Sequence, residues 1–535
     1  MEKHASESYY IVDEGLLVVS AGGRNGGPPE GEISRRRVEA DIAADGPPFR
    51  FSRMGPRGIG RQLGDPNRKR LGNAMAAGGG GTGQIPAGFT YLGQFIDHDL
   101  TFDKTEVMLG ANISPAALLQ GRSPELDLDS LYGAGPLDPE SAKFYEADGI
   151  HLKKGKTKAI DPFPALEGHD HPRGAGTTQA QKRKAIIPDK RNDENLAVAQ
   201  THLAFVRFHN RVVDTLPASV PASQRFDTAR ELVTKHYQWM IRTDYLPRIC
   251  AAGVVNNVFN QGRKAFEVGA TPTDVPTMPV EFSVAAFRLG HSMIREAYNW
   301  NKAFDNGSGF LSYLFEFSAT GGNLGGETRL LSNWVADFRR LYNFGEANKP
   351  NLVVPAAKFN KAMRIDTRLV DPLKNLPPGT FGGPTVPFND PRANLAFRNL
   401  TRAKMVKLAT GQQMANFLKS KGVNLTKLTK TQIRDGNNGA KLDRLTAAQR
   451  AALLKDTPLW FYILREAELN GGKLKGVGAR IVAETIHRAM EGSEHSIVRD
   501  TAFKPSFGPN NNTFRMVDLL LFAFEGKKTL LAPLG

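Results

Sequence analysis

Long stretches with helical periodicity and no proline run through the middle of this chain, and they limit its fold more than any other feature. Residues 196–216 and 226–245 carry apolar side chains at helical spacing, and residues 282–298 and 481–490 show the same pattern. Alternating patterns typical of strands are few and short. Because helices without a sheet bury their apolar stripes against one another, the pattern predicts a mainly α-helical protein with little β structure.

Glycine, proline and polar residues separate these segments and predict long loops. The loop signals lie at residues 22–31, 78–83, 134–183 and 372–391. No repeat recurs at a fixed period. We therefore expect one large domain over residues 70–535, with residues 1–69 forming an N-terminal arm and loops that pack on this core.

The composition is that of a soluble globular protein, because 40% of the 535 residues are hydrophobic and 23% are charged. The single cysteine, Cys250, excludes a disulfide framework within the chain, cysteine-rich zinc modules and four-cysteine iron–sulfur sites. The net charge of +16 comes from basic residues that are widely spread, which indicates a solvated basic surface and no nucleic-acid partner. We expect no membrane span, and without a recognisable signal peptide we expect a cytoplasmic protein, with signal-independent secretion as the alternative.

The segment from Tyr91 to Asp103 groups chemically active side chains at helical spacing. In a helix, Gln94, Asp97 and His98 stand at positions i, i+3 and i+4 and share one face. Asp99 lies about 200° from Asp97 around the helix and faces the opposite way. One turn thus offers an amide, a carboxylate and an imidazole to one site and a second carboxylate to another, although a capped loop or a magnesium site gives a similar pattern.

Two later segments add a cation and a second imidazole. Arg191 and Glu194 lie three residues apart where a helix begins, with Asn192 or Asp193 as the expected N-cap, and a surface ion pair is the simpler interpretation. In the third segment, Arg288 and His291 share a face. Gly290 beside them removes bulk, which favours the close approach of a flat group, although a core histidine is the ordinary alternative.

Two other patterns are interpreted as loops. The glycine run at residues 78–83 lacks the Lys-Ser/Thr ending with which a phosphate loop grips phosphate and magnesium. His169-Asp170-His171 has metal-binding residue types but no helical partner, so we expect a solvated loop there.

Taken in order, the three segments resemble the animal haem peroxidases of the peroxidase–cyclooxygenase superfamily, in particular its bacterial members. Gln94-Phe-Ile-Asp97-His98-Asp99 is similar to the family's distal motif, Arg191-x-x-Glu194 to its distal arginine segment, and Arg288-Leu-Gly-His291 to its proximal motif. Asn399-Leu-Thr-Arg402 is similar to the family's proximal asparagine and its arginine partner. The resemblance covers about residues 70–500 and implies a single large haem peroxidase domain that binds haem b.

For the proximal side, the resemblance implies that His291 is the iron ligand and that Asn399 holds its other ring nitrogen. Arg288 and Arg402 are expected to pair with haem propionates or to brace this side.

For the distal side, the resemblance implies that His98 is the general acid–base, that Arg191 supplies positive charge as the O–O bond breaks, and that Gln94 holds the distal water. The implied activity is reduction of hydrogen peroxide with oxidation of a halide, thiocyanate or a small organic donor such as a phenol, through a ferryl intermediate.

Two carboxylates match those that form ester bonds to haem methyl groups in the family, Asp97 and Glu194. The myeloid branch of the family adds a sulfonium link through a methionine directly after that glutamate. This chain has Asn195 there, which excludes the link. We therefore expect iodide, bromide, thiocyanate or organic donors in place of efficient chloride oxidation.

The family's calcium loop has a counterpart in Ser123-Pro-Glu125-Leu-Asp127-Leu-Asp129. The resemblance implies that Asp99 binds Ca²⁺ together with side chains of Ser123, Asp127 and Asp129 and the carbonyl of Glu125, all hard oxygen ligands.

Two alternatives stay open. The first is a fatty-acid dioxygenase on the same fold, a branch in which a tyrosine stands three residues before the proximal histidine; this chain has Arg288 there, and Tyr298 follows His291. The second is a haem- or calcium-binding protein that has kept the scaffold without catalysis.

Overall fold

The computed structural model describes residues 49–60, 63–103, 105, 110–376 and 390–535, together with two short strands, β1 (Ser8–Tyr10) and β2 (Leu16–Val18). Most of the predicted arm, including the glycine- and proline-rich residues 22–31, and much of the proline-rich passage at 372–391 lie outside the described residues. Helix α2 (Asp65–Met75) spans the predicted boundary at residue 70 and packs on α13 (Leu395–Met405), so its first residues lie with the core.

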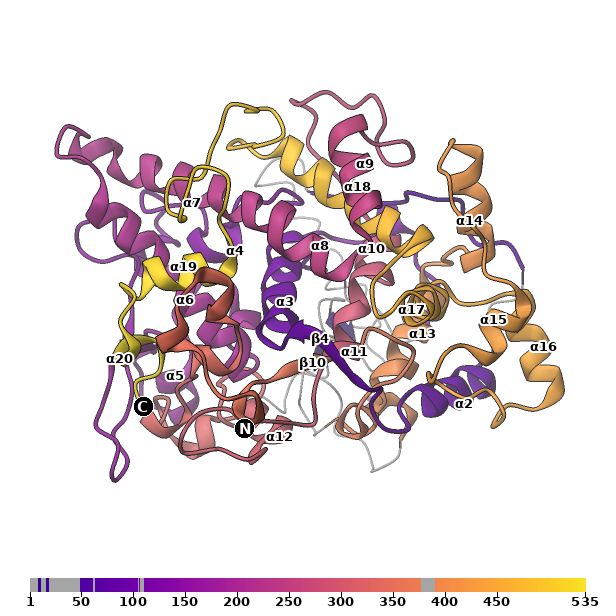
Figure 1. Ribbon diagram of the computed structural model, residues 1–535, viewed down its shortest axis with the longest axis horizontal. Helices are drawn as coiled ribbons and strands as arrows, with labels where there is room; N and C mark the ends of the chain where they lie inside the picture. Colours follow the sequence, from indigo (N-terminus) through magenta and orange to yellow (C-terminus); the bar gives the residue numbers. More distant parts are fainter. Residues whose placement is uncertain are drawn as a thin grey trace, which may run out of the picture.

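The described part of the chain is mainly α-helical, as predicted (Figure 1). The other longer helices are α3 (Gly88–Leu100), α6 (Leu196–Thr215), α7 (Arg225–Met240), α9 (Ala252–Gln261), α14 (Gly411–Ser420), α16 (Ala447–Lys455), α17 (Leu459–Leu469), α18 (Gly476–Gly492) and α19 (Met516–Ala523). The short helices are α4 (Asp129–Tyr132), α5 (Gln179–Arg183), α8 (Leu246–Ile249), α10 (Val280–Ser283), α11 (Gly290–Met293), α12 (Leu311–Glu316), α15 (Lys430–Asp435) and α20 (Lys528–Leu531). No helix among the described residues is both long enough and apolar enough to cross a membrane.

The described strands are short and occur only in pairs. β1 pairs with β2, β3 (Phe51–Ser52) with β7 (Met278–Pro279), β4 (Thr82–Pro86) with β10 (Lys361–Met363), β5 (Gly155–Lys156) with β6 (Glu167–Asp170), and β8 (Ala297–Tyr298) with β9 (Gly309–Phe310). Of these, only β3 and β7 run parallel. The antiparallel β4–β10 pair leads directly into α3 and fixes where that helix begins.

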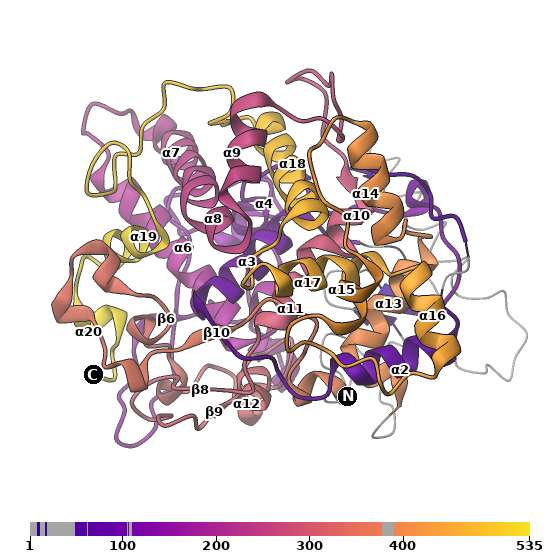
Figure 2. The same cartoon turned by 45° about the vertical axis from the view of Figure 1, so that its right-hand side comes forward.

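Helix α3 lies at the centre of the molecule, with α6, α7 and α19 on one side and α13 and α2 on the other (Figures 1 and 2). Every residue of α3 except Gln94 is buried. Phe95 stacks on Phe205 of α6 with ring centroids 4.5 Å apart, and this contact joins the two helices at their most apolar faces. The residues that the sequence singles out on α3 therefore lie inside the core.

Residues 196–216 and 481–490 form helices as predicted, in α6 and within α18. Residues 226–245 form α7 and then a single π-helical turn, η6 (Ile241–Tyr245). This turn presents Tyr245 to α3, where Gly93 leaves room for its hydroxyl: a Cβ at Gly93 would stand 2.2 Å from that oxygen.

The continuous helix expected over residues 282–298 is wrong. The segment contains α10, the 3₁₀ turn η7 (Ala286–Leu289), α11 and strand β8 in succession. Arg288 Nε donates to the carbonyl of Ser283 at 2.6 Å and takes the acceptor that a continuous helix would use for its own N–H group. The break turns α11 toward α3.

A buried glutamate joins α17 to α18. Glu466 accepts hydrogen bonds from the backbone N–H groups of Val477 and Gly478, at 3.3 and 3.2 Å, in the first turn of α18. Burial raises the pKa of Glu466 to about 8, although these hydrogen bonds oppose the rise.

The free energy of unfolding should fall with rising pH because of Glu466. Between about pH 4.5 and pH 8 the unfolded chain ionises this group while the folded chain keeps its proton. The stabilisation by Glu466 is therefore present at low pH, and across this range the free energy of unfolding falls by roughly 1.4 kcal/mol per pH unit. Glu466→Gln removes this loss, and urea unfolding at pH 5, 6, 7 and 8 measures it. The control is Glu140→Gln, at a side chain 91% exposed. Parallel pH curves for the wild type and Glu466→Gln would contradict the assignment.

Candidate active site

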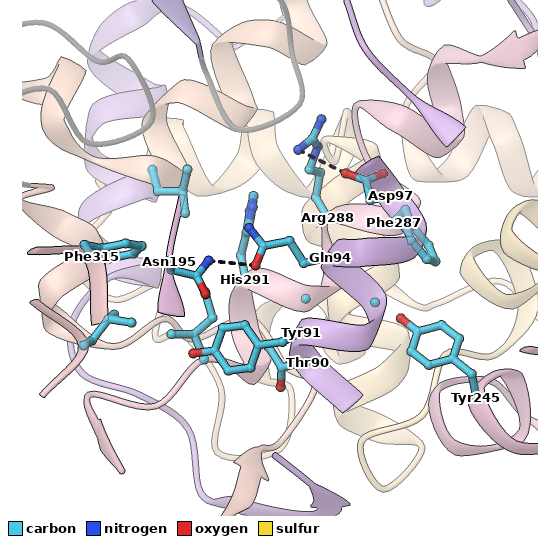
Figure 3. Close-up of a pocket in the computed structure, with 15 residues that line it drawn as sticks. Thr90, Tyr91, Gln94, Asp97, Asn195, Tyr245, Phe287, Arg288, His291 and Phe315 are labelled. Atoms are coloured by element: carbon cyan, nitrogen blue, oxygen red, sulfur yellow. Dashed lines mark hydrogen bonds and ion pairs between the residues drawn. The ribbon is translucent and has the colours of Figure 1, made fainter. Parts of the chain in front are cut away.

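A cavity lies between α3, α11 and α12 and has a volume of about 650 Å³, part of it open to solvent (Figure 3). It is lined by Thr90, Tyr91, Gly93, Gln94, Asp97, Asn195, Tyr245, Phe287, Arg288, Gly290, His291, Ile294, Leu311, Phe315 and Leu395. Most of the lining is apolar, with a few converging polar groups, as is usual for cofactor and ligand sites.

The two helices that carry the motifs face one another across this cavity. Gln94 and Asp97 project from α3, and Arg288 and His291 reach the cavity from η7 and α11 (Figure 3). Arg288 Nη1 lies 3.9 Å from Asp97 Oδ2, so an ion pair spans the two walls. The packing of α11 on α3 thus brings together two motifs almost 200 residues apart.

His98 is fully buried behind the cavity wall and is not among its lining residues. Its Nδ1 lies 2.9 Å from Asn192 Oδ1, and Asn192 Nδ2 lies 3.1 Å from Nδ1 of His202. Because an amide oxygen only accepts, His98 carries a proton on Nδ1, and in the neutral ring Nε2 then has the lone pair. That Nε2 stands 3.5 Å from Glu194 Oε1, where a carboxylate would stabilise a proton gained by the ring.

Gln94 is held in place by two neighbours from the start of α6. Its Nε2 donates to Glu194 Oε1 at 2.5 Å, and its Oε1 accepts from Asn195 Nδ2 at 2.9 Å (Figure 3). Asn195 is also the N-cap of α6, since its Oδ1 accepts from Val198 N at 3.0 Å. The predicted N-cap, Asn192 or Asp193, is wrong because residues 190–193 form a 3₁₀ turn of their own, η4, which Asp189 caps.

Arg191 belongs to η4 and, like His98, is buried without lining the cavity. Its guanidinium pairs with Asp189, Nη2 to Oδ2 at 2.7 Å, and donates from the same Nη2 to the carbonyl of His98 at 2.8 Å. The burial of Arg191 and Glu194 excludes the simple surface ion pair that the sequence also allowed.

On the other side of the cavity, His291 contacts Asn399 of α13 through its Nδ1, 2.9 Å from the amide nitrogen. A ring nitrogen and an amide can pair in two ways, with the amide N–H donating to Nδ1 or with Nδ1–H donating to the amide oxygen. The second pairing leaves a lone pair on Nε2 of His291, which is the form that ligates a metal.

Arg402 lies away from the cavity, fully buried beside Asn399 on the same helix. It forms an ion pair with Asp103, three residues beyond the end of α3. This contact ties α13 to the segment that follows α3.

The second carboxylate of α3 belongs to a separate acidic cluster. Single ligand atoms of Asp99, Asp127 and Asp129 lie within 4.8 Å of one another. Burial, followed by the charge of Asp129, raises the pKa of Asp99 to about 8, and burial with the charges of neighbouring carboxylates raises that of Asp127. One buried and two half-buried carboxylates at this separation repel one another and are suited to a bound cation.

The two remaining residues of the predicted calcium loop lie in the turn that leads to this cluster. Ser123 is buried and its N–H donates to Asp129 Oδ2 at 3.1 Å. Glu125 N–H donates to Ser123 Oγ at 3.3 Å. The three carboxylates thus lie together on the side of α3 opposite Asp97, with Ser123 bonded to Asp129 and Glu125 bonded to Ser123.

The solvated loop expected at residues 169–171 is wrong. His169 and Asp170 belong to strand β6, and all three residues are buried. His171 Nε2 lies 3.3 Å from the carbonyl of Asn192, and burial lowers the pKa of His171 to about 3, so the ring is neutral. The segment supports the turn behind His98.

Residues 106–312 match the family model for animal haem peroxidases. The matched region contains Arg191, Glu194, Arg288 and His291 but neither α3 nor Asn399.

Curated relatives match over about a third of the chain or slightly more. Thyroid peroxidase from Rattus norvegicus is 28% identical over 192 residues, which cover 34% of this chain and 20% of that protein. Heme peroxidase 2 from Caenorhabditis elegans is 23% identical over 191 residues, 34% of this chain and 25% of that protein. A peroxidase-like protein from Margaritifera margaritifera is 24% identical over 251 residues, 39% of this chain and 32% of that protein. The matches thus span a fifth to a third of the relatives' length.

Solved structures extend the likeness to the whole fold. Peroxidase A from Dictyostelium discoideum superposes with a TM-score of 0.54 at 15% identity, covering 91% of this chain and 94% of that one. Fatty acid alpha-dioxygenase from Arabidopsis thaliana gives 0.53 at 12% identity, covering 90% and 78%. The fold is therefore one that peroxidases and dioxygenases share, and at these identities the likeness concerns the fold alone.

Proposed function

We propose that this protein is a haem peroxidase that reduces hydrogen peroxide and oxidises a small donor. The main observation behind the proposal is the arrangement of polar groups in the apolar cavity. Gln94 and Asp97 on α3 lie on one wall, and His291 on α11 lies on the opposite wall. The family match over residues 106–312 supports the same class of oxidoreductase.

The residues of the cavity fit a haem group. His291 has one ring nitrogen engaged by Asn399, which can leave Nε2 as the iron ligand, and the neutral amide keeps the ligand neutral. Gly290 leaves room for the close approach of a flat group, because a Cβ built on it would meet nothing within 4 Å. Bound haem would supply the iron that binds peroxide and the redox chemistry that a protein side chain lacks.

The chain's own residues would carry the proton chemistry. In the neutral form of His98, whose Nδ1 donates to Asn192, Nε2 would take the proton of peroxide and return it to the leaving oxygen. Arg191 would supply positive charge where negative charge develops, and Gln94, fixed by Glu194 and Asn195, would orient water or a donor. Asp97 and Glu194 are proposed to form ester bonds to the haem periphery.

Peroxidase chemistry is favoured over fatty-acid dioxygenation by the residue three positions before His291. That residue is Arg288, whose guanidinium is tied to Ser283 and lies beside Asp97, and it cannot form a phenoxyl radical. Tyr298 is buried and its hydroxyl pairs with that of Tyr91 at 2.7 Å. The proposed donors are iodide, bromide, thiocyanate or phenols, because Asn195 occupies the position of the myeloid methionine.

The acidic cluster is proposed to bind Ca²⁺. Asp99 adjoins His98 on α3, so a cation held by Asp99, Asp127 and Asp129 would also fix the position of His98. Ser123 and the carbonyl of Glu125 would complete the oxygen set.

Loading the full chain with haem tests the central proposal. The absorption spectrum should change on addition of one equivalent of peroxide and return on addition of bromide or a phenol. His98→Ala should lower the second-order rate constant with peroxide by about 10²- to 10⁴-fold at unchanged haem content, because the proton acceptor is lost. His151→Ala, at a half-buried surface histidine, is the control.

Three results would contradict this proposal. Failure to bind haem would remove the role of His291, and an unchanged rate in His98→Ala would remove that of His98. Oxygen uptake with a long-chain fatty acid, without any reaction with peroxide, would favour the dioxygenase.

Gly290→Leu should block haem while sparing the fold. The backbone of Gly290 has φ −55°, which any residue adopts, and the added side chain would enter the cavity. We expect an apo protein with the melting temperature of the wild type and a strongly reduced haem absorbance per protein. Gly253→Leu is the matched control, since Gly253 lies in α9, is exposed and also has nothing within 4 Å of its Cβ position. Full haem loading of Gly290→Leu would place the cofactor elsewhere.

Calcium should stabilise the apo protein through the acidic cluster. A ligand present at 100 times its dissociation constant adds about 2.7 kcal/mol to the free energy of unfolding, so the melting temperature should rise when Ca²⁺ replaces a chelator. Asp127→Asn should reduce this rise, whereas Mg²⁺, which prefers octahedral sites, should give a smaller one. A melting temperature that ignores Ca²⁺ would argue against the site.

A further inference from the structure

Asp189 binds two arginines at once at the start of η4. Its Oδ1 accepts from the backbone N–H and from Nε of Arg191, at 2.9 and 3.0 Å, and its Oδ2 accepts from Nη2 of Arg191 at 2.7 Å. The same Oδ2 also accepts from Arg122 Nε at 2.9 Å and lies 2.8 Å from Arg122 Nη2. The carboxylate therefore holds the Arg191 guanidinium along one edge and is itself held by a second cation.

The Arg191 end of this cluster of Arg122, Asp189 and Arg191 contacts the segment that contains His98. Arg191 Nη2 donates to the carbonyl of His98 at 2.8 Å. The ring of Phe102, two residues beyond the end of α3, lies 4.6 Å from the Arg191 guanidinium and 5.9 Å from that of Arg122. Arg191 is thus fixed by an anion, a carbonyl and an aromatic face, and each of these contacts suits a planar guanidinium.

The two positive charges of this cluster keep Asp189 ionised although it is buried. Burial alone would raise the pKa of Asp189, but the positive charges of Arg191 and Arg122 outweigh it and hold that pKa well below its usual range. Arg122 also stands 3.6 Å from Asp129, so it connects Asp189 to the acidic cluster.

The local part of this arrangement occurs twice more in the described residues. Asp337 accepts from the backbone N–H, Nε and Nη2 of Arg339 at the start of the 3₁₀ turn η10 (Phe338–Arg340), and also from Nε of Arg340. Asp390 binds Arg392 in the same way. The Asp-x-Arg cap by itself is therefore a structural device for starting a 3₁₀ turn. Only the copy at Asp189 is attached to the backbone of His98.

We propose that Asp189, supported by Arg122, is the positioning residue that sets the place of Arg191 beside His98 in the reaction with peroxide. This inference rests on the proposed peroxidase function. An arginine side chain carries about 2 kcal/mol of rotamer entropy, so a guanidinium without these contacts would spend much of its time elsewhere. A charge stabilises a developing charge best when its position is set before the reaction.

The alternative effect has the opposite sign, which makes the proposal testable. If Asp189 only neutralised Arg191, removing its charge would strengthen the positive field and speed the reaction with peroxide. If Asp189 positions Arg191, Asp189→Asn should slow that reaction by about 10- to 100-fold, as loss of a supporting partner behind a reacting group does.

The experiment compares Asp189→Asn with Asp337→Asn, which removes the same charge from the same type of cap with two arginines. For each haem-loaded variant, the rate constant with peroxide, the dissociation constant of cyanide from its absorbance change, the haem content and the melting temperature are measured. Asp337→Asn should lower the melting temperature and keep the wild-type rate constant and cyanide affinity. Asp189→Asn should lower both the rate constant with peroxide and the affinity for cyanide.

A double-mutant cycle with Arg191→Lys shows whether Asp189 acts through Arg191. A lysine cannot form the edge-on pair, so Asp189→Asn should have little further effect on rate or cyanide affinity in the Arg191→Lys background. Arg122→Lys gives a second variant if Asp189→Asn does not fold, and it should show a smaller loss of the same kind.

Equal effects of Asp189→Asn and Asp337→Asn would overturn the proposal, as would an additive cycle or a faster reaction in Asp189→Asn. A haem-loaded wild type that does not react with peroxide would instead overturn the proposed function, and this inference with it.

Discussion

The burial of α3 on all sides is the constraint on which the rest of the structure depends. A helix in the middle of the core cannot leave polar side chains in water, and each buried polar group is costly without a partner. Its side chains therefore find partners in separate segments: His98 in η4, Asp97 in η7 and Asp99 in α4. The same requirement that stabilises the fold assembles the candidate site.

Buried charge is handled in this protein by sharing it among several groups. Asp189 lies between two arginines, and Arg402 pairs with Asp103 away from the cavity. Removing one member of such a buried set leaves the other charge buried without a partner. The stability lost in this way is larger than the net stability that the set gives relative to hydrophobic residues of similar size. The rigidity of these sets suits a site in which protons and developing charges must meet fixed partners.

Much of the site could be predicted from the sequence because its signals are local. The helical repeat places Gln94 and Asp97 on one face of α3 and Asp99 on another, and the structure shows that arrangement. The sequence predicts the wrong element for the segment around His291, where Arg288 donates to the carbonyl of Ser283 and the helix is interrupted. Asn192 was noticed only as a possible cap, and nothing in its neighbourhood along the chain points to His98.

The sequence by itself determined the mainly helical class, the residue types at the two walls and their spacing within each motif, since these follow from periodicity over a few turns. Only the tertiary structure decided which groups meet. It places the segment around His171 in the core, Asn192 in contact with both His98 and His202, and Arg122 in contact with Asp189. The physical reason is that a buried polar group pairs with whatever the packing brings within about 3 Å, and packing joins residues far apart in the chain.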